Sequence, residues 1–150
     1  MPIAGQGDKW LQAYVPYLLY RTSNQLNQRI RARLRKAGVN ITRWRVLAVL
    51  RAYGRLNLGR IAELTAMEQP SISRIVTHLE RDGFAQREVS TEDSRVVYVR
   101  LTPAGEKAFA SIYPTAQRHQ QTALRGFSQQ DIDLLTGLLR RIQKNIEAEG

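Results

Sequence analysis

Residues 58–109 read LGRIAELTAMEQPSISRIVTHLERDGFAQREVSTEDSRVVYVRLTPAGEKAF, and the pattern of this stretch decides the fold. Within residues 69–82, apolar side chains recur at i, i+3, i+4 and i+7, which predicts a helix with one stripe facing a core. Those apolar residues are Ile72, Ile75, Val76 and Leu79. The other face carries short hydroxyl side chains and cations, namely Ser71, Ser73, Arg74, Thr77, His78 and Arg81. Such side chains contact phosphates and base edges when a helix lies in a major groove.

The ends of this helix, and a shorter helix before it, are marked in the sequence. Pro70 suits the first helical position because its missing N–H needs no partner there, and Gly83 supplies a left-handed stop. Residues 59–65 predict the shorter helix, and residues 66–68 form the turn between the two. This is the layout of a helix-turn-helix, although pairs of amphipathic helices are also common in ordinary helical cores.

After the second helix, the period of the apolar residues changes from 3.6 to 2. Residues 84–89 and 96–101 are rich in β-branched and aromatic side chains and flank a polar loop at 90–95, which predicts a two-stranded hairpin. Within the loop, Asp93 and Arg95 are two residues apart, so the carboxylate can orient the guanidinium for a narrow minor groove. The alternative is a solvated ion pair that contributes almost nothing.

We call the helix at 69–82 the reader helix and the hairpin at 84–101 the wing. The sequence resembles the MarR (multiple antibiotic resistance regulator) family of bacterial transcription factors in these two features, in the Asp-x-Arg of the wing and in the Leu-Thr-Pro-Ala-Gly that follows it at 101–105. The resemblance covers nearly the whole chain. It implies a homodimer that binds a pseudo-palindromic DNA operator, usually as a repressor, and in many members releases the DNA when a small, often aromatic, ligand binds. It also implies a winged helix-turn-helix DNA-binding lobe over residues 42–101.

The resemblance assigns roles to individual residues of this sequence. Ser71, Ser73 and Arg74 match the reader positions of the family, and Asp93 and Arg95 match its wing motif. Together with four further residues of the reader helix, these are the residues expected to contact DNA. The further four are Gln69, Pro70, Thr77 and His78.

Composition agrees with a DNA-binding domain. A chain of 150 residues is about one domain, and its formal net charge of +10 favours a polyanionic partner, although membrane surfaces are also anionic. No run approaches the ~18 apolar residues of a spanning helix, and the amino terminus lacks the features of a signal peptide, so we expect a cytoplasmic protein without a membrane partner. The absence of cysteine excludes disulfides, thiolate metal sites and a cysteine-based peroxide sensor.

Two helices are predicted before the helix-turn-helix and two after the wing. With the two helices of the helix-turn-helix, this makes six. Residues 10–36 predict one long helix that Pro16 kinks near its start. A second helix, which Thr42 caps, continues to residue 53 and is closed by Gly54.

The helices after the wing begin at residue 102 and at Ser128. The first continues to about residue 124 with a bend at Pro114, and the second has Asp131 in capping-box position. Because the terminal helices have wide apolar faces, we expect residues 9–37 and 103–148 to form a two-fold dimer interface; packing within one chain is the alternative. The predicted fold is mainly α with a small β wing.

No pattern for catalysis or for a metal or other cofactor is present. His78 and His119 are the only histidines, far apart and without carboxylates at ligand spacing, and the sequence has no phosphate loop or nucleophile with a nearby base. We therefore expect neither an enzyme nor a metal site. The alternative to a specific regulator is a basic architectural module that binds nucleic acid without sequence preference.

An effector pocket is predicted on the first two helices, where the family places one. The expected ligand is a planar acid, an aromatic carboxylate or its thioester, because an arginine lies beside aromatic residues. The residues are Trp10, Tyr14, Tyr17, Trp44 and Arg45, although such aromatic spacing is more often part of a core. A basic segment at 29–36 is a phosphate-contacting flank, an anchor for an acidic ligand or a solvated helix face.

Overall fold

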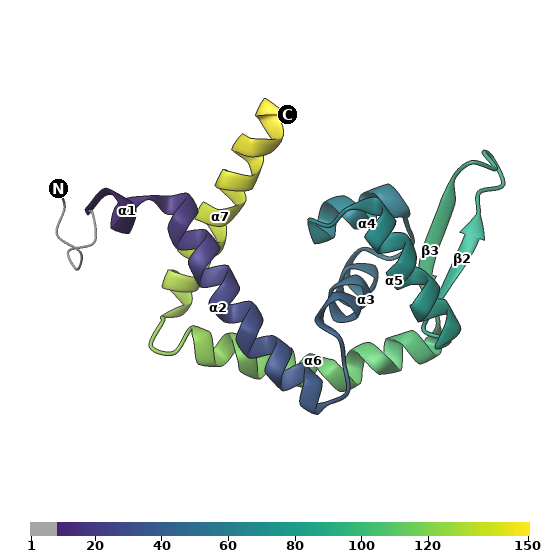
Figure 1. Ribbon diagram of the computed structural model, residues 1–150, viewed down its shortest axis with the longest axis horizontal. Coiled ribbons are helices and arrows are strands. Elements are labelled where there is room, and N and C mark those ends of the chain that lie inside the picture. The colour runs from purple at the N-terminus through teal and green to yellow at the C-terminus, as the bar shows by residue number, and fades with distance from the viewer. Residues whose placement is uncertain (1–8) are drawn as a thin grey trace, which may run out of the picture. The chain divides into compact units, whose positions relative to one another are not determined.

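The computed structural model describes residues 9–150, which form seven helices and three short strands. The chain divides into two compact units, one ending at Ala116 and one comprising Gln117–Gly150. Figure 1 colours the chain from purple near its start to yellow at the C-terminus. The candidate site lies in the first unit. None of the helices formed by residues 9–150 is long and apolar enough to cross a membrane.

The first predicted helix is two helices, α1 (Lys9–Ala13) and α2 (Val15–Lys36). The helix is interrupted at Tyr14, whose backbone is extended (φ −79°, ψ 103°), so that Pro16 falls in the first turn of α2. A proline is tolerated there because the first N–H groups of a helix have no intrahelical partner. The expected kink in one helix is therefore wrong, and the described residues contain seven helices instead of six.

Helix α3 (Ile41–Tyr53) begins one residue before the predicted cap. Asn40 is the N-cap, because its side-chain oxygen accepts hydrogen bonds from the backbone N–H of Thr42 at 2.8 Å and from the Thr42 hydroxyl at 2.5 Å. The prediction that Thr42 caps this helix is wrong: Asn40 is a better capping residue and lies two residues earlier. Gly54, with φ 78°, ends the helix as predicted.

The helix-turn-helix consists of α4 (Leu58–Thr65) and α5 (Gln69–Arg81). Between them Ala66 adopts a left-handed conformation with φ 53°, which produces the tight turn. The predicted apolar stripe of α5 is buried, with Ile72 and Val76 fully inaccessible to solvent. Gly83 follows α5 with φ 80°, as its position after the last helical turn predicts.

The wing is part of a three-stranded antiparallel sheet of order β1-β3-β2. Strands β2 (Ala85–Val89) and β3 (Val97–Leu101) form the predicted hairpin. Strand β1 (Leu56–Asn57) pairs with β3 and was not predicted, because a two-residue strand has no periodicity to detect. The sheet closes the core of the first unit, which is built from α2, α3, α4, α5 and the first half of α6. Its buried residues are Ile30, Leu34, Ile41, Val46, Leu47, Leu50, Ile61, Ile72, Ile75, Val76, Leu79, Ala85, Val99 and Ile112.

The joint between the wing and α6 (Pro103–Ala123) is closely packed. The Thr102 hydroxyl donates to the Gly83 carbonyl at 2.5 Å and accepts from the Gly105 N–H at 3.1 Å. The Thr102 N–H donates to the Phe84 carbonyl at 3.1 Å. Gly105 is buried against that same carbonyl, so the Thr-Pro-Ala-Gly segment fixes the first turn of α6 to the end of α5.

Helix α6 continues through Pro114 without interruption. In the second unit, α7 (Gln129–Glu149) begins with the predicted capping box: the Ser128 hydroxyl accepts from the Asp131 N–H, and the Asp131 carboxylate accepts from the Ser128 N–H. None of the residues of α7 is buried. Five of its large apolar side chains are exposed, namely Leu134, Leu135, Leu138, Leu139 and Ile146.

Candidate nucleic-acid interface

The outer face of α5 is polar and open to solvent. Arg74, Thr77 and His78 are exposed, whereas Ser71 and Ser73 are half-buried beside them. Gln69 and Pro70 are exposed at the start of the helix. One guanidinium nitrogen of Arg74 lies 3.4 Å from the Ser71 hydroxyl, which is a long contact that leaves the remaining donors of Arg74 available. The N-terminal turns of α5 thus present hydrogen-bond donors to solvent.

Arg87 on β2 connects the wing to this helix through hydrogen bonds. The sequence pattern did not single out this residue. Its guanidinium donates to Glu80 Oε1 at 2.6 Å, to the Ser73 carbonyl at 2.9 Å and to the Thr77 hydroxyl at 3.1 Å. The same guanidinium lies 3.2 Å from the Ser73 hydroxyl, and the Arg87 N–H donates to Glu80 Oε2 at 3.0 Å. We call Arg87, Glu80, Ser73 and Thr77 the wing clamp. It sets the angle between β2 and the reader face of α5.

The ionisation of Glu80 supports the wing clamp at neutral pH. Desolvation opposes ionisation of this carboxyl, but hydrogen bonds from the backbone and guanidinium of Arg87 outweigh it and lower the Glu80 pKa below its usual value. A lowered pKa means that the native state favours the carboxylate. The contribution to stability is therefore present above the usual glutamate range and disappears as the pH falls through the lowered pKa.

At the tip of the wing, Asp93 holds Arg95 as predicted. The Asp93 carboxylate accepts from the Arg95 backbone N–H at 3.0 Å and from two guanidinium nitrogens at 3.1 Å each. These hydrogen bonds lower the Asp93 pKa, so the pair stays ionised in mildly acidic solution. The Arg95 side chain remains 89% exposed, so its guanidinium is oriented but not covered.

The opposite face of the sheet carries a second polar network that was also not predicted. Glu88 on β2 accepts from Arg100 of β3 and lies 3.3 Å from Arg55, which precedes β1. Arg55 also lies over the Tyr98 ring, 4.0 Å from its centroid. Glu88 therefore links β2 to β3 and to the residue that precedes β1, one pair away from the loop end of the hairpin. The strand alternation could have revealed this face, because Glu88, Tyr98 and Arg100 all fall on the side opposite Arg87.

The predicted effector residues do not form one cluster in the structure. The Trp10 and Tyr14 rings are 5.4 Å apart and exposed, and Tyr17 is half-buried on α2. Trp44 instead stacks on Phe109 of α6 with ring centroids 5.2 Å apart. Arg45, one residue along, donates to Asn27 of α2 at 2.7 Å. Burial and the nearby Arg31 charge lower the pKa of Arg45.

The stack around Trp44 borders a cavity between α3 and α6. Phe109 stacks in turn on Tyr113, and Arg51 reaches over the Phe109 ring while pairing with Glu106 at 2.9 Å. The cavity has a volume of ≈ 520 Å³ and is lined by Ala48, Arg51, Ala52, Glu106, Phe109, Ala110 and Tyr113. We call it the Arg51 cavity. It combines aromatic walls with an arginine, as expected of the effector pocket, but on residues that were not predicted and with Glu106 already paired to that arginine.

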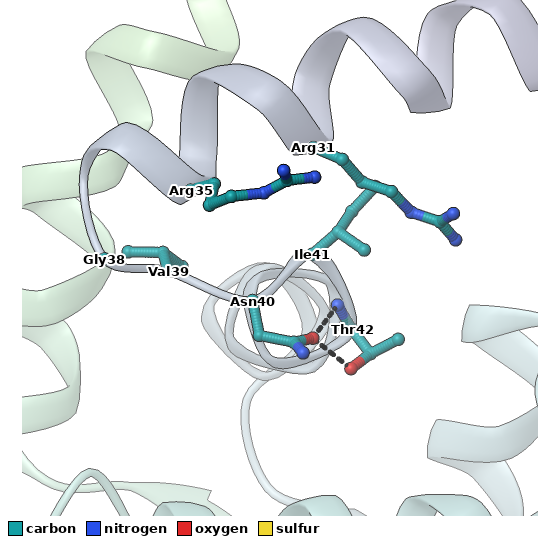
Figure 2. A pocket seen from close by; sticks show the side chains of 7 residues that line it. All are labelled: Arg31, Arg35, Gly38, Val39, Asn40, Ile41 and Thr42. Carbon is teal, nitrogen blue, oxygen red and sulfur yellow. Dashed lines mark hydrogen bonds between the residues drawn. The ribbon is translucent and has the colours of Figure 1, made fainter.

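The basic segment of α2 borders a recess at the start of α3 (Figure 2). Arg31 and Arg35, one helical turn apart, extend from α2 beside Ile41. Asn40 also lines the recess, and its side-chain oxygen accepts hydrogen bonds from the N–H and hydroxyl of Thr42. No carboxylate lines it. Two of the five basic residues at 29–36 are therefore positioned to attract anions, and they do so together with the first turn of α3.

Comparison with known proteins places the chain among transcription regulators. A sequence model of the MarR family matches residues 39–97. The HTH-type transcriptional regulator YwaE of Bacillus subtilis (strain 168) is 28% identical over 129 residues, which cover 85% of this chain and 75% of YwaE. The regulator YkoM of the same organism is 32% identical over 104 residues, covering 69% of this chain and 68% of YkoM. The HTH-type transcriptional repressor IacR of Pseudomonas putida is 26% identical over 131 residues, covering 87% of this chain and 78% of IacR.

Solved structures show the same architecture. A MarR family transcriptional regulator from Silicibacter pomeroyi DSS matches with a TM-score of 0.84 and 28% identity over 97% of each chain. NadR, solved in complex with 4-hydroxyphenylacetate, matches with a TM-score of 0.79 over 95% of this chain and 97% of NadR. Its 24% identity supports a shared fold.

Proposed function

Because the chain belongs to the MarR family of winged helix-turn-helix transcription regulators, we propose that it is a ligand-responsive repressor that binds a pseudo-palindromic operator as a homodimer. The observation that carries the proposal is the exposed polar face of α5, held at a fixed angle to the wing by Arg87. The formal net charge of +10 favours association with DNA. Repression is supported by the name of the relative IacR.

The DNA-binding lobe comprises residues 42–101, with two separate contact regions. The reader residues of α5 enter the major groove, where Arg74 is placed to form a bidentate contact with a base edge. Arg95 enters the adjacent minor groove with its orientation set by Asp93. The wing clamp determines whether both contacts form at once.

The segments 9–37 and 103–148 provide the dimer interface in this proposal. The support is the apolar side chains that α7 leaves exposed, Leu135, Leu138 and Leu139 among them. Contiguous exposed apolar surface of this kind is typical of a protein–protein interface. Two copies related by a two-fold axis would bury it.

The effector site in this proposal is the Arg51 cavity. Its volume of ≈ 520 Å³ suits a small molecule, and its aromatic walls suit a planar one. Because Glu106 also lines the cavity and pairs with Arg51 at 2.9 Å, an acid that binds there must displace Glu106 from the guanidinium. The 4-hydroxyphenylacetate bound to NadR gives the class of compound to test first, the aromatic acids. Such an acid releases DNA only if it binds more tightly to a conformation whose reader helices no longer match the operator.

Arg74→Ala is expected to cost about 1–3 kcal/mol of operator binding, because it removes a bidentate base contact. The measurement is fluorescence anisotropy on a duplex selected from a random pool, beside a scrambled duplex. Arg81→Ala is the matched control, since it removes the same charge from the exposed C-terminal turn of α5. Equal losses on the selected and scrambled duplexes would instead indicate a non-specific architectural module.

Arg87→Gln is expected to weaken operator binding about tenfold, because a wing that is free to rotate loses the simultaneous groove contacts. Arg100→Gln is the comparison variant: it removes one charge from the neighbouring strand and breaks the contact with Glu88, but leaves the wing clamp intact. The same anisotropy assay compares both variants with the wild type, with circular dichroism to verify folding. Wild-type affinity in Arg87→Gln would show that the wing clamp has no part in DNA binding.

Arg95→Ala and Asp93→Asn separate the charge of the wing arginine from its orientation. Arg95→Ala should weaken binding and flatten the dependence of affinity on salt, because one phosphate-proximal cation is lost. Asp93→Asn keeps the cation but frees it, so affinity should fall by a smaller factor while the wild-type salt slope remains. Titrations between low and moderate salt give both quantities. A larger loss in Asp93→Asn than in Arg95→Ala would contradict the assigned roles.

A further inference from the structure

A second cavity, of ≈ 450 Å³, lies against the C-terminal end of α5. Its walls are mainly apolar and come from residues 38–40 before α3, from α3, α5 and α6, and from the residue after Gly83. The lining residues are Gly38, Val39, Asn40, Arg43, Leu47, Leu79, Phe84, Ala104, Lys107, Ala108, Ser111 and Ile112. We call it the Arg43 cavity. It shares no residue with the Arg51 cavity, and on α6 the two are lined by different faces of the helix.

The chemistry of this lining selects one kind of ligand. Arg43 and Lys107 provide two cations, while Leu47, Leu79 and Phe84 are among the apolar residues that face a ligand body. None of the lining residues is acidic. The volume is within the range of sites that bind small molecules, about 300–1,000 Å³. We propose that the Arg43 cavity binds a small carboxylic acid with an apolar body, its carboxylate between Arg43 and Lys107.

The electrostatic field around the Arg43 cavity also favours a negatively charged ligand. Residues 38–40 also border the recess that contains Arg31 and Arg35, so four cationic side chains lie around adjoining hollows. Clustered charge of one sign beside a concave surface raises the local concentration of counter-ions. An acid approaching the cavity is therefore attracted before it makes any direct contact.

The cavity is connected to the reader helix through an ion pair. Arg43 donates to Asp82 Oδ2 at 2.9 Å, and Asp82 is the C-cap of α5. A ligand carboxylate at Arg43 competes with Asp82 for the same guanidinium. Leu79 in the last turns of α5 and Phe84 just beyond the helix both line the cavity, so a ligand there contacts the chain on either side of Asp82. Release of DNA by this ligand rests on the proposed function; binding of the ligand does not.

The test uses the full-length protein with octanoate and phenylacetate as probes, and their uncharged amides as controls. Backbone amide shifts in NMR titrations locate each probe. We expect saturable shifts at Leu79, Phe84 and Ala108 with an acid and none with its amide. Arg43→Gln should weaken binding about tenfold, and Arg43→Lys should restore part of the affinity. Asp82→Asn should tighten binding several-fold, because it removes the competing carboxylate.

The outcomes separate this inference from the proposed function. Suppose that the shifts are confined to Ala48, Ala110 and Tyr113 and are lost in Arg51→Gln. This result would overturn the proposal that the acid binds in the Arg43 cavity and would support the Arg51 cavity as the effector site. Weaker binding in Asp82→Asn, or no acid-specific shift in the wild type, would overturn the inference whatever the DNA-binding assays show. Binding at the Arg43 cavity that leaves operator affinity unchanged would support the site and contradict its role in release. By reciprocity, an acid that releases DNA must itself bind more weakly to the DNA complex.

Discussion

Gly105→Ala is expected to lower the free energy of unfolding by about 3 kcal/mol, at the upper end of overpacking substitutions. A Cβ atom at this position would lie 2.0 Å from the Phe84 carbonyl oxygen and 2.9 Å from its carbon. Neither atom can move alone, because that oxygen also accepts from the Thr102 N–H. The first turn of α6 would have to shift away from the end of α5, which breaks the joint at Thr102.

The measurement is urea denaturation followed by circular dichroism. The slope of the unfolding free energy against urea concentration is compared between variants, to verify that the same transition is observed. Gly137→Ala is the matched control, since a Cβ at Gly137 in α7 meets no heavy atom within 4 Å. That substitution should leave stability unchanged or raise it by up to about 1 kcal/mol, as for glycine in a helix interior. Gly105→Ala with wild-type stability would show that the close approach at Phe84 does not exist in solution.

Inserting about half a helical turn, ~5 bp, between the two halves of the selected operator should weaken binding by about 100-fold or more. In the proposed dimer, two α5 helices enter major grooves about one helical turn apart, so the insertion places the second half-site on the wrong side of the duplex. One subunit then binds alone. The control on the DNA is the insertion of a full helical turn. It returns the second half-site to the same side of the duplex but increases the distance between the two half-sites.

The control on the protein is Leu135→Asp, which places a carboxylate on the apolar face of α7. Burial of an unpaired carboxylate is costly, so this variant should sediment as a monomer and bind intact and expanded operators with equal, low affinity. A wild-type protein that sediments as a monomer at binding concentrations would contradict the dimer. Equal affinity of the wild type for both operators would contradict the two-fold arrangement.

The features that the sequence predicted correctly are fixed by residues close together in the chain. The apolar stripe of α5, the left-handed Gly83 and the capping box of Ser128 depend on spacings of one to seven residues. The pairing of Asp93 with Arg95 spans two residues. Each belongs to one turn or one helix, where local sterics and hydrogen bonding decide the conformation.

The features that sequence could not predict depend on contacts between elements. Arg87 reaches Ser73 across fourteen residues, and its hydrogen bonds become visible only when β2 is placed beside α5. Trp44 was grouped with Tyr14 because both are aromatic residues on neighbouring helices, yet its ring stacks on Phe109, sixty-five positions later. Side-chain type predicts what kind of partner a residue accepts, but tertiary packing decides which one it finds.

The wing clamp has a consequence for what Thr77 can read. A hydroxyl group has one proton, and the proton of Thr77 is directed to the Ser73 carbonyl at 2.9 Å, while its oxygen accepts from Arg87. Thr77 therefore has no donor left for a phosphate, whereas Ser73 only accepts from Arg87 and retains its own proton. If Thr77 contacts the operator as proposed, it does so through its methyl group, whose counterpart in the major groove is the methyl group of thymine.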